Sequence, residues 1–161
     1  MNPSDVLKYG HRTLMKTLEA FPKEEVYTQG ACGFWSVKDI VAHYGSFELV
    51  LVEVLNLFLD GGPTPYLDEF ASSRRDDFND VQVSKRAEMS MEQVLEEYLN
   101  AHDEAMAAAA RIPDEIWNKQ GALPGYGEQY DLGDFIVYTF YGHKREHSGQ
   151  IAVFRDQFVS E

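Results

Sequence analysis

Cysteine is almost absent from this 161-residue chain, and its one copy, Cys32, cannot form a disulfide within the chain. Small domains that depend on disulfides are found in oxidising compartments, so the composition predicts a cytoplasmic protein. The N-terminal residues contain neither a basic segment nor an apolar core, and we therefore expect no signal peptide. No histidine lies near Cys32 in the sequence, which favours a loop or packing role for it over that of a nucleophile.

Basic residues are also scarce. The chain has 14 lysines and arginines against 27 aspartates and glutamates, for a net charge of −13. This excess of negative charge repels the phosphates of nucleic acids and of anionic membranes, so neither is an expected partner. The chain also lacks an uninterrupted run of about 18 apolar residues, the length that would predict a membrane-spanning helix.

Proline and glycine, with six and twelve residues, gather in a few places and leave long segments free of helix breakers. Within those segments apolar residues recur every three or four positions, which is the period of an amphipathic helix. The pattern predicts four long helices, over residues 4–21, 36–58, 90–112 and 131–158. No segment of useful length shows the two-residue alternation of a β-strand. We therefore expect an all-α fold, a four-helix bundle that forms a single domain over residues 1–161.

Three of the predicted helices share a start signature, in which an N-cap residue is followed three positions later by a side chain that can bond back to it. These pairs are Ser36 and Asp39, Ser90 and Gln93, and Asp131 and Asp134. The longest link, residues 60–89, has a pattern that suits a short helix at about 73–87. The link over residues 113–130 is rich in turn-forming residues and is expected to be irregular.

The segment 143–147, His-Lys-Arg-Glu-His, carries the clearest functional pattern. Its two histidines lie four residues apart, so they share one face of a helix, and that face is the apolar one. Buried imidazoles need a partner, and a metal ion can serve both. His43, on the apolar face of the second helix, can supply a third ligand, and three imidazoles with an open position are typical of catalytic zinc sites. Core histidines that hydrogen-bond to their neighbours are the structural alternative.

The same segment also fits H-x-x-E-H, a zinc-peptidase pattern in which Glu146 would act as a general base on metal-bound water. That class needs a further carboxylate ligand downstream, and only Asp156 and Glu161 follow, on or after the same helix. The pattern is short, so we favour another role for Glu146. We expect it at the solvent edge of the helix, paired with Arg145 or Lys144.

Two segments of the chain resemble the DinB-like superfamily. The first is W-S-V-K-D-I-V-A-H, residues 35–43, at the start of the second predicted helix. The second is H-x-x-x-H followed by S-G-Q-I, residues 143–151. The resemblance implies a four-helix bundle with up-down-down-up topology. Its long crossover joins the second and third helices, which matches the long link over residues 60–89.

The resemblance also implies a divalent metal ion, zinc or nickel, held by His43, His143 and His147. With the implied topology, the helical rise of about 1.5 Å per residue places these three imidazoles at one level of the bundle. His102 falls nearby and is a candidate for a fourth or neighbouring group, whereas His11 lies lower and is expected to be structural. Many members of the superfamily are homodimers, so we expect a homodimer.

The superfamily includes mycothiol-dependent maleylpyruvate isomerases and thiol transferases, so the resemblance implies a metal-dependent enzyme that acts on a small molecule. The expected reaction is thiol transfer or isomerisation with a low-molecular-weight thiol, or hydrolysis, at an open coordination position. Tyr44, Glu48, Arg145 and Gln150 lie within about two helical turns of a predicted ligand and are candidates for further roles. The alternative function is a non-catalytic metal-binding module of the stress response.

Overall fold

The computed structural model describes the backbone of residues 2–159 and the side chains in that range, except those of residues 75 and 76. This part of the chain is helical and contains no β-strand; a lone β-bridge joins Cys32 to Trp35. The prediction of an all-α fold is therefore confirmed. Residues 1, 160 and 161 of the predicted domain lie outside the described residues, so the single-domain extent stays a prediction.

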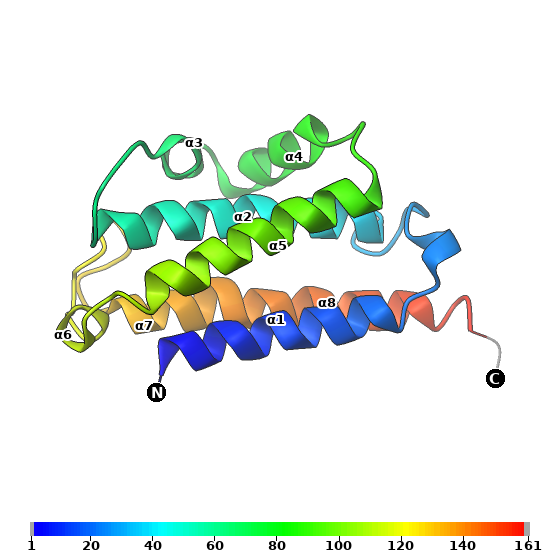
Figure 1. Cartoon of the computed structure of the whole chain (residues 1–161). Coiled ribbons are helices and arrows are strands. Elements are labelled where there is room, and N and C mark those ends of the chain that lie inside the picture. The colour runs from blue at the N-terminus through cyan, green and yellow to red at the C-terminus, as the bar shows by residue number, and fades with distance from the viewer. Residues whose placement is uncertain (1, 160–161) are drawn as a thin grey trace.

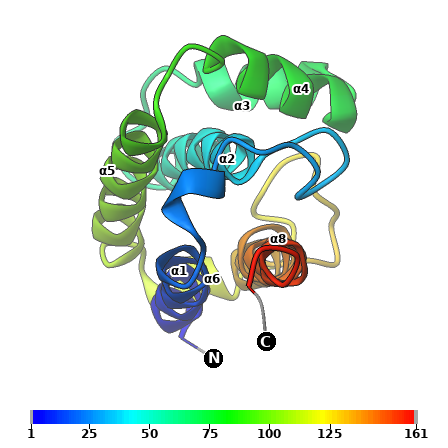
Figure 2. The same cartoon turned by 90° about the vertical axis from the view of Figure 1, so that its right-hand side faces the viewer.

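Four long helices surround the interior: α1 (Pro3–Glu19), α2 (Val37–Leu57), α5 (Met91–Ala109) and α8 (Gly142–Arg155). α2 packs along α5, and α1 packs along α8. The end-on view shows the four around a common core, with α3 (Pro65–Ser72) and α4 (Arg75–Lys85) on the outer side of α2 (Figure 2). In Figure 1, α1 and α8 run from left to right, whereas α2 and α5 run from right to left.

α2 is the central helix, and 15 of its 21 residues are buried. It is long and apolar enough to cross a membrane by length and composition alone. Most of it is covered by the other helices, however, which is the pattern of a core helix in a soluble protein. Because α2 is enclosed on nearly every side, a polar side chain on it must find a partner within the fold.

The predicted helix starts carry the capping boxes expected of them. At α2, the Asp39 backbone N–H donates to Ser36 Oγ at 3.2 Å, and the Ser36 N–H donates to the Asp39 carboxylate at 3.0 Å. The same reciprocal bonds form at the starts of α5 and of α7 (Leu132–Phe135). Each box satisfies two backbone donors that no helical carbonyl reaches, which is why these starts are readable from a few residues.

The crossover contains two helices, α3 and α4, where one short helix at about 73–87 was predicted. The start of α3 depends on α2, because the backbone N–H groups of Tyr66 and Leu67 donate to the Glu53 carboxylate at 3.3 and 2.7 Å. A capping acid that comes from another helix leaves no local signature, so the sequence did not predict α3. Short helices also occur in two other links: η1 (Lys23–Glu25) and α6 (Asp114–Trp117).

The fourth predicted helix, residues 131–158, is not one regular helix. α7 is followed by η2 (Ile136–Tyr141), a π-helical segment, and then by α8, which ends at Arg155. A π-helical turn holds more residues than an α-helical turn, so it rotates every later side chain about the axis. Such turns occur often at functional sites, and this one ends two residues before His143. The expectation of a regular helix was wrong because the spacing of apolar residues does not reveal a wider turn.

Candidate metal centre

Three histidines from two helices meet in the interior: His43 of α2, and His143 and His147 of α8. His143 Nε2 lies 2.8 Å from His43 Nε2 and 3.0 Å from His147 Nε2. One ring nitrogen of each histidine lies within 4.8 Å of the other two. Helical spacing places the α8 pair on one face, and the packing of α8 against α2 adds His43. The structure therefore brings together all three histidines predicted as ligands.

The spacing of the three imidazoles suits a metal ion better than a set of hydrogen bonds. A ring nitrogen carries either a hydrogen or a lone pair, so His143 Nε2 cannot form good hydrogen bonds with both of its neighbours. Nitrogens that bind one zinc ion at about 2.0–2.1 Å in tetrahedral geometry lie about 3.3 Å from each other. The two observed separations of 2.8 and 3.0 Å are slightly shorter than that spacing. The three side chains could therefore hold a divalent ion after a small outward shift.

Burial keeps two of the clustered imidazoles, those of His43 and His147, neutral, which is the state in which a ring nitrogen binds metal. His43 is 1% exposed, and burial, together with the nearby His143 and His147 rings, lowers its pKa to about 2. Burial also lowers the pKa of His147, against the opposing effects of a hydrogen bond with Gln150 and the charge of Glu146. At neutral pH the lone pairs of His43 and His147 are therefore available to an ion.

Aromatic rings enclose the cluster on the α2 side. The Trp35 ring lies 4.9 Å from that of His43, and the Phe47 ring lies 4.7 and 4.8 Å from those of His43 and His143. Tyr44 is 1% exposed, and its hydroxyl donates to a backbone carbonyl of α8 at 3.0 Å. These contacts fix the two helices beside each other and surround the nitrogens with a medium of low polarity, which strengthens electrostatic interactions there.

A cavity of about 320 Å³ opens beside the cluster, and His143 lies in its wall. The rest of the wall comes from α2, α4, η2, α8 and the link before α7: Phe47, Asn79, Tyr126, Tyr138, Thr139, Gly142 and Glu146. His143 is half-buried, whereas His43 and His147 are buried. A small molecule in this cavity would therefore reach the cluster from the His143 side.

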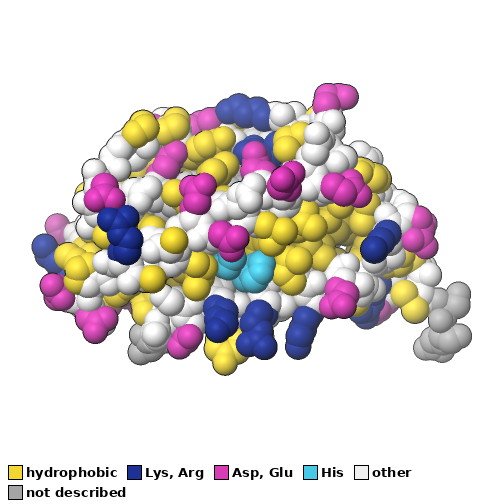
Figure 3. Space-filling model, viewed as in Figure 1, with side chains coloured by type: hydrophobic (Ala, Val, Ile, Leu, Met, Phe, Trp, Pro, Cys, Tyr) yellow, Lys and Arg dark blue, Asp and Glu magenta, His cyan; other side chains and the backbone are white. Residues whose placement is uncertain are grey.

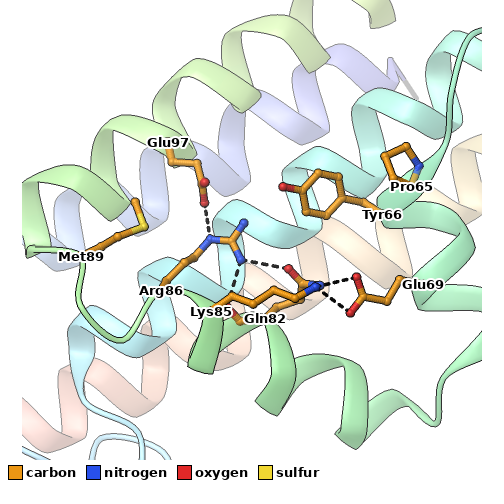
Figure 4. Close-up of a pocket in the computed structure, with 8 residues that line it drawn as sticks. All are labelled: Pro65, Tyr66, Glu69, Gln82, Lys85, Arg86, Met89 and Glu97. Carbon is orange, nitrogen blue, oxygen red and sulfur yellow. Dashed lines mark hydrogen bonds and ion pairs between the residues drawn. The ribbon is translucent and has the colours of Figure 1, made fainter.

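Another cavity, of about 470 Å³, lies between α3, α4 and α5 (Figure 4). Its charged side chains neutralise each other, because Arg86 pairs with Glu97 and Lys85 pairs with Glu69 at 2.9 Å. The described residues that line it include no histidine. It is the larger of the two cavities, but the smaller one reaches groups that can bind a metal ion and is therefore the candidate site.

A comparison with protein families assigns the chain. The sequence profile of the DinB superfamily matches residues 7–151, a span that includes all three clustered histidines. The chain belongs to the DinB superfamily. No curated protein and no solved structure matched it. The family resemblance of residues 35–43 and 143–151 is therefore confirmed.

In this DinB-superfamily protein, Gln150 orients one of the clustered histidines. Its side-chain oxygen lies 2.6 Å from His147 Nδ1, about one turn further along α8. When Nδ1 donates its hydrogen to that oxygen, the lone pair of His147 Nε2 points toward the other two imidazoles. Gln150, one of the candidates named from the sequence, is therefore a positioning residue for the cluster.

Replacing Gln150 by leucine is expected to weaken divalent-ion binding about tenfold or more, because His147 loses the partner that holds its ring. The measurement is a titration of ion-free protein with Zn²⁺ in competition with a chromophoric chelator. Gln157→Leu is the matched control, since Gln157 is exposed beyond the end of α8 and its loss should not change the affinity. Equal affinities in Gln150→Leu and the wild type would contradict the positioning role.

His102, predicted as a neighbour of the cluster, belongs to a separate buried network. Its Nδ1 lies 3.3 Å from one oxygen of Glu48, and its ring stacks on that of His11 at 4.2 Å. The other Glu48 oxygen forms an ion pair with Lys144. Burial alone would raise the pKa of Glu48, but the charge of Lys144 and the contact with His102 lower it to about 2. His102 therefore interacts with the buried carboxylate of Glu48 and is not a member of the three-histidine cluster.

The expected pairing of Glu146 with Arg145 or Lys144 is wrong. Lys144 is 2% exposed and pairs with Glu48, while the Arg145 guanidinium lies 5.7 Å from the centre of an aromatic ring in η2. Glu146 is exposed and lies in the wall of the cavity.

The zinc-peptidase pattern lacks its further carboxylate ligand in the part of the chain that the structure describes. Asp156 is exposed and pairs with Arg155 at 2.9 Å, and Glu161 lies outside the described residues. His43 completes the group instead. Residues 143–147 therefore supply two of the three histidines in the cluster, and α2 supplies the third.

Cys32 lies closer to the cluster than its place in the sequence suggested. Burial and then the charge of Glu146 raise the pKa of its thiol, against the opposing effect of a hydrogen bond with Gln150. A thiol with a raised pKa stays protonated at neutral pH and is a poor nucleophile. The structure thus adds a contact with the site and agrees with the packing role expected of Cys32.

His11 gives the fold a defined response to acid. It packs against α5, and histidine atoms reach the surface between α1 and α5 in Figure 3. Burial, followed by the charges of His102 and Lys144, lowers the pKa of His11 from 6.5 to about 4. Between these pH values the unfolded chain binds more protons than the folded chain, so His11 reduces stability as the pH falls from about 6.5 to about 4.

The variant His11→Gln is expected to lose stability less steeply over that pH range, because glutamine does not titrate. The free energy of unfolding, measured with urea at several pH values between about 7 and 4, provides the comparison. Parallel profiles for variant and wild type would show that His11 does not titrate as described.

Proposed function

We propose that this protein is a metal-dependent enzyme that acts on a small molecule through a divalent ion held by His43, His143 and His147. Zinc and nickel are the favoured ions, because imidazole nitrogen suits both. The observation that supports the proposal is the meeting of three imidazoles beside a cavity whose wall includes His143. Three protein ligands leave at least one coordination position for a substrate or a thiol.

The chain's own residues prepare the site for this chemistry. Burial keeps His43 and His147 neutral, Gln150 orients His147, and the rings of Trp35 and Phe47 limit access of water. When bound, a divalent ion supplies a Lewis acid that lowers the pKa of a coordinated thiol or water. Thiol transfer, isomerisation and hydrolysis all use such a centre. We favour thiol transfer with a low-molecular-weight thiol, since the superfamily includes thiol transferases.

Elemental analysis of the purified protein tests the metal site. We expect one zinc or nickel ion per chain in the wild type and its loss in His143→Ala. The control is His11→Gln, which alters a histidine outside the cluster and should retain the ion. A wild-type protein that remains free of metal after incubation with Zn²⁺ and Ni²⁺ would overturn the proposal in favour of a structural histidine core.

Thiol-conjugation assays test the enzymatic part of the proposal. An activated electrophile is offered with several bacterial thiols to the ion-loaded protein and to protein stripped with a chelator. Conjugation that depends on the ion supports the enzyme. An ester is offered as well, to test for hydrolysis. Ion binding without conjugation of any thiol and without hydrolysis of the ester supports the non-catalytic metal-binding module instead. Activity that survives removal of the ion would refute the proposed chemistry.

We also propose that the four long helices form the up-down-down-up bundle of the DinB-like fold, with α3 and α4 in the crossover. The helix directions in Figure 1 support this assignment. The homodimer and the cytoplasmic location stay predictions from the family resemblance and the composition. Light scattering after gel filtration tests the first, since a homodimer has twice the mass of the chain.

A further inference from the structure

The cavity beside His143 presents several aromatic rings. Phe47, Tyr126 and Tyr138 all lie in its wall. The ring of Phe47 packs 4.8 Å from that of His143, and the ring of Tyr126 packs 5.0 Å from that of Phe135. Tyr138 is 65% exposed, which places its ring toward solvent. Ring faces carry a negative potential and attract organic cations.

The same wall contains acceptors that the protein leaves without a donor. The side-chain oxygen of Asn79 is buried and has no hydrogen-bond partner among the described residues. The carboxylate of Glu146 is exposed and takes no part in the ion pairs formed within residues 2–159. A buried acceptor without a donor is costly, so the wall favours a ligand that brings N–H groups.

Without the ion, the charge of the wall is negative. Glu146 is the charged residue among its described side chains, which include no lysine or arginine. The cavity of Figure 4 differs in this respect, because there each acid faces a base: Lys85 with Glu69 and Arg86 with Glu97. The net charge of −13 on the whole chain adds a long-range repulsion of anions.

We propose that the molecule taken up beside the three histidines carries an organic ammonium group, and that the cavity selects against anions. The inference rests on the proposed function, because it names the substrate class of the same site. Aromatic rings, an unpartnered oxygen and a carboxylate all suit an ammonium group better than a carboxylate. A dicarboxylate would therefore be a poor ligand for this cavity.

Three benzyl thiols that differ only in their para substituent test the proposal: aminomethyl, hydroxymethyl and carboxyl. Each is titrated into the cobalt-loaded protein, and the thiolate-to-cobalt absorption band reports binding. We expect the amine to bind about threefold to tenfold more tightly than the alcohol, and the acid to bind more weakly by a similar factor. Glu146→Gln should remove most of the difference in affinity between the amine and the acid. Glu92→Gln, at an exposed glutamate of α5 outside the cavity wall, should change none of the three.

The parent compounds without the thiol are then tested on ion-free protein by ligand-observed NMR. We expect the same order of affinities, with the amine above the alcohol and the alcohol above the acid, but weaker binding of all three. The reason is that the cavity wall, and not the ion, discriminates between the charges of the compounds. If no thiol reaches cobalt but this order persists, the proposed function fails and the inference stands. If affinity does not depend on charge, or the acid binds most tightly in both series, the inference is overturned, while a thiolate band would still support the proposed function.

Discussion

Lys144→Met is expected to lower the free energy of unfolding by about 3–5 kcal/mol. Its partner, Glu48, has no exposed side-chain surface, so the variant would leave a buried carboxylate without its cation. The pair joins α2 to α8, which are the two helices that supply the clustered histidines. Urea-induced unfolding at about pH 7 measures the loss, since Glu48 is then ionised.

Two further variants distinguish the cost of leaving a buried charge unpaired from the cost of removing a lysine. Lys85→Met removes a lysine that is 53% exposed and pairs with Glu69, and it is expected to cost at most about 1 kcal/mol. Combining Lys144→Met with Glu48→Leu should recover much of the loss, because apolar side chains can replace a buried ion pair. If Lys144→Met costs no more than Lys85→Met, the buried pair does not stabilise the fold as described.

Saturation with Zn²⁺ is expected to raise the melting temperature of the wild-type protein by several degrees. An ion present at about one hundred times its dissociation constant adds about 2.7 kcal/mol to the stability of a fold that alone can bind it. For a domain of this size each kcal/mol corresponds to about 2–4 °C or slightly more. Differential scanning fluorimetry of ion-free protein, with and without Zn²⁺, measures the shift.

The shift should disappear in His43→Ala, because the remaining pair on α8 cannot hold the ion as tightly without the ligand from α2. His11→Gln controls for the loss of a histidine outside the cluster and should retain the full shift. An equal shift in His43→Ala and the wild type would place the bound ion elsewhere on the chain.

The π-helical segment links the fold to the proposed chemistry. Tyr138 and Thr139 of η2 lie in the cavity wall, and His143 follows two residues after its end. A regular helix over the same residues would turn the later side chains to other directions. The wide turn therefore helps to set both the shape of the cavity and the side from which a small molecule reaches His143.

Several features of the fold were predictable because they depend on a few neighbouring residues. A capping box needs only Ser36 and Asp39, and helical spacing alone places His143 and His147 on one face. With the topology that the family resemblance implies, the rise per residue puts His43 at the same level, so the resemblance brought the three-histidine cluster within reach. The all-α class followed from the period of the apolar residues.

Other features were decided only by the tertiary structure. Lys144 and Glu48 lie 96 positions apart in the sequence, and nothing local to either residue indicates that they pair. The cap on α3 comes from Glu53 of α2, and Asn79 reaches the cavity wall because the crossover packs on the outer side of α2.

The sequence by itself therefore determined the helices, most of their starts and the shared face of His143 and His147, because backbone hydrogen bonding and helical period act over a few residues. The tertiary structure alone decided the partners of the buried charges, the wide turn before His143 and the walls of the cavity. These depend on which surfaces the packing removes from water, and that is set by contacts between segments far apart in the chain.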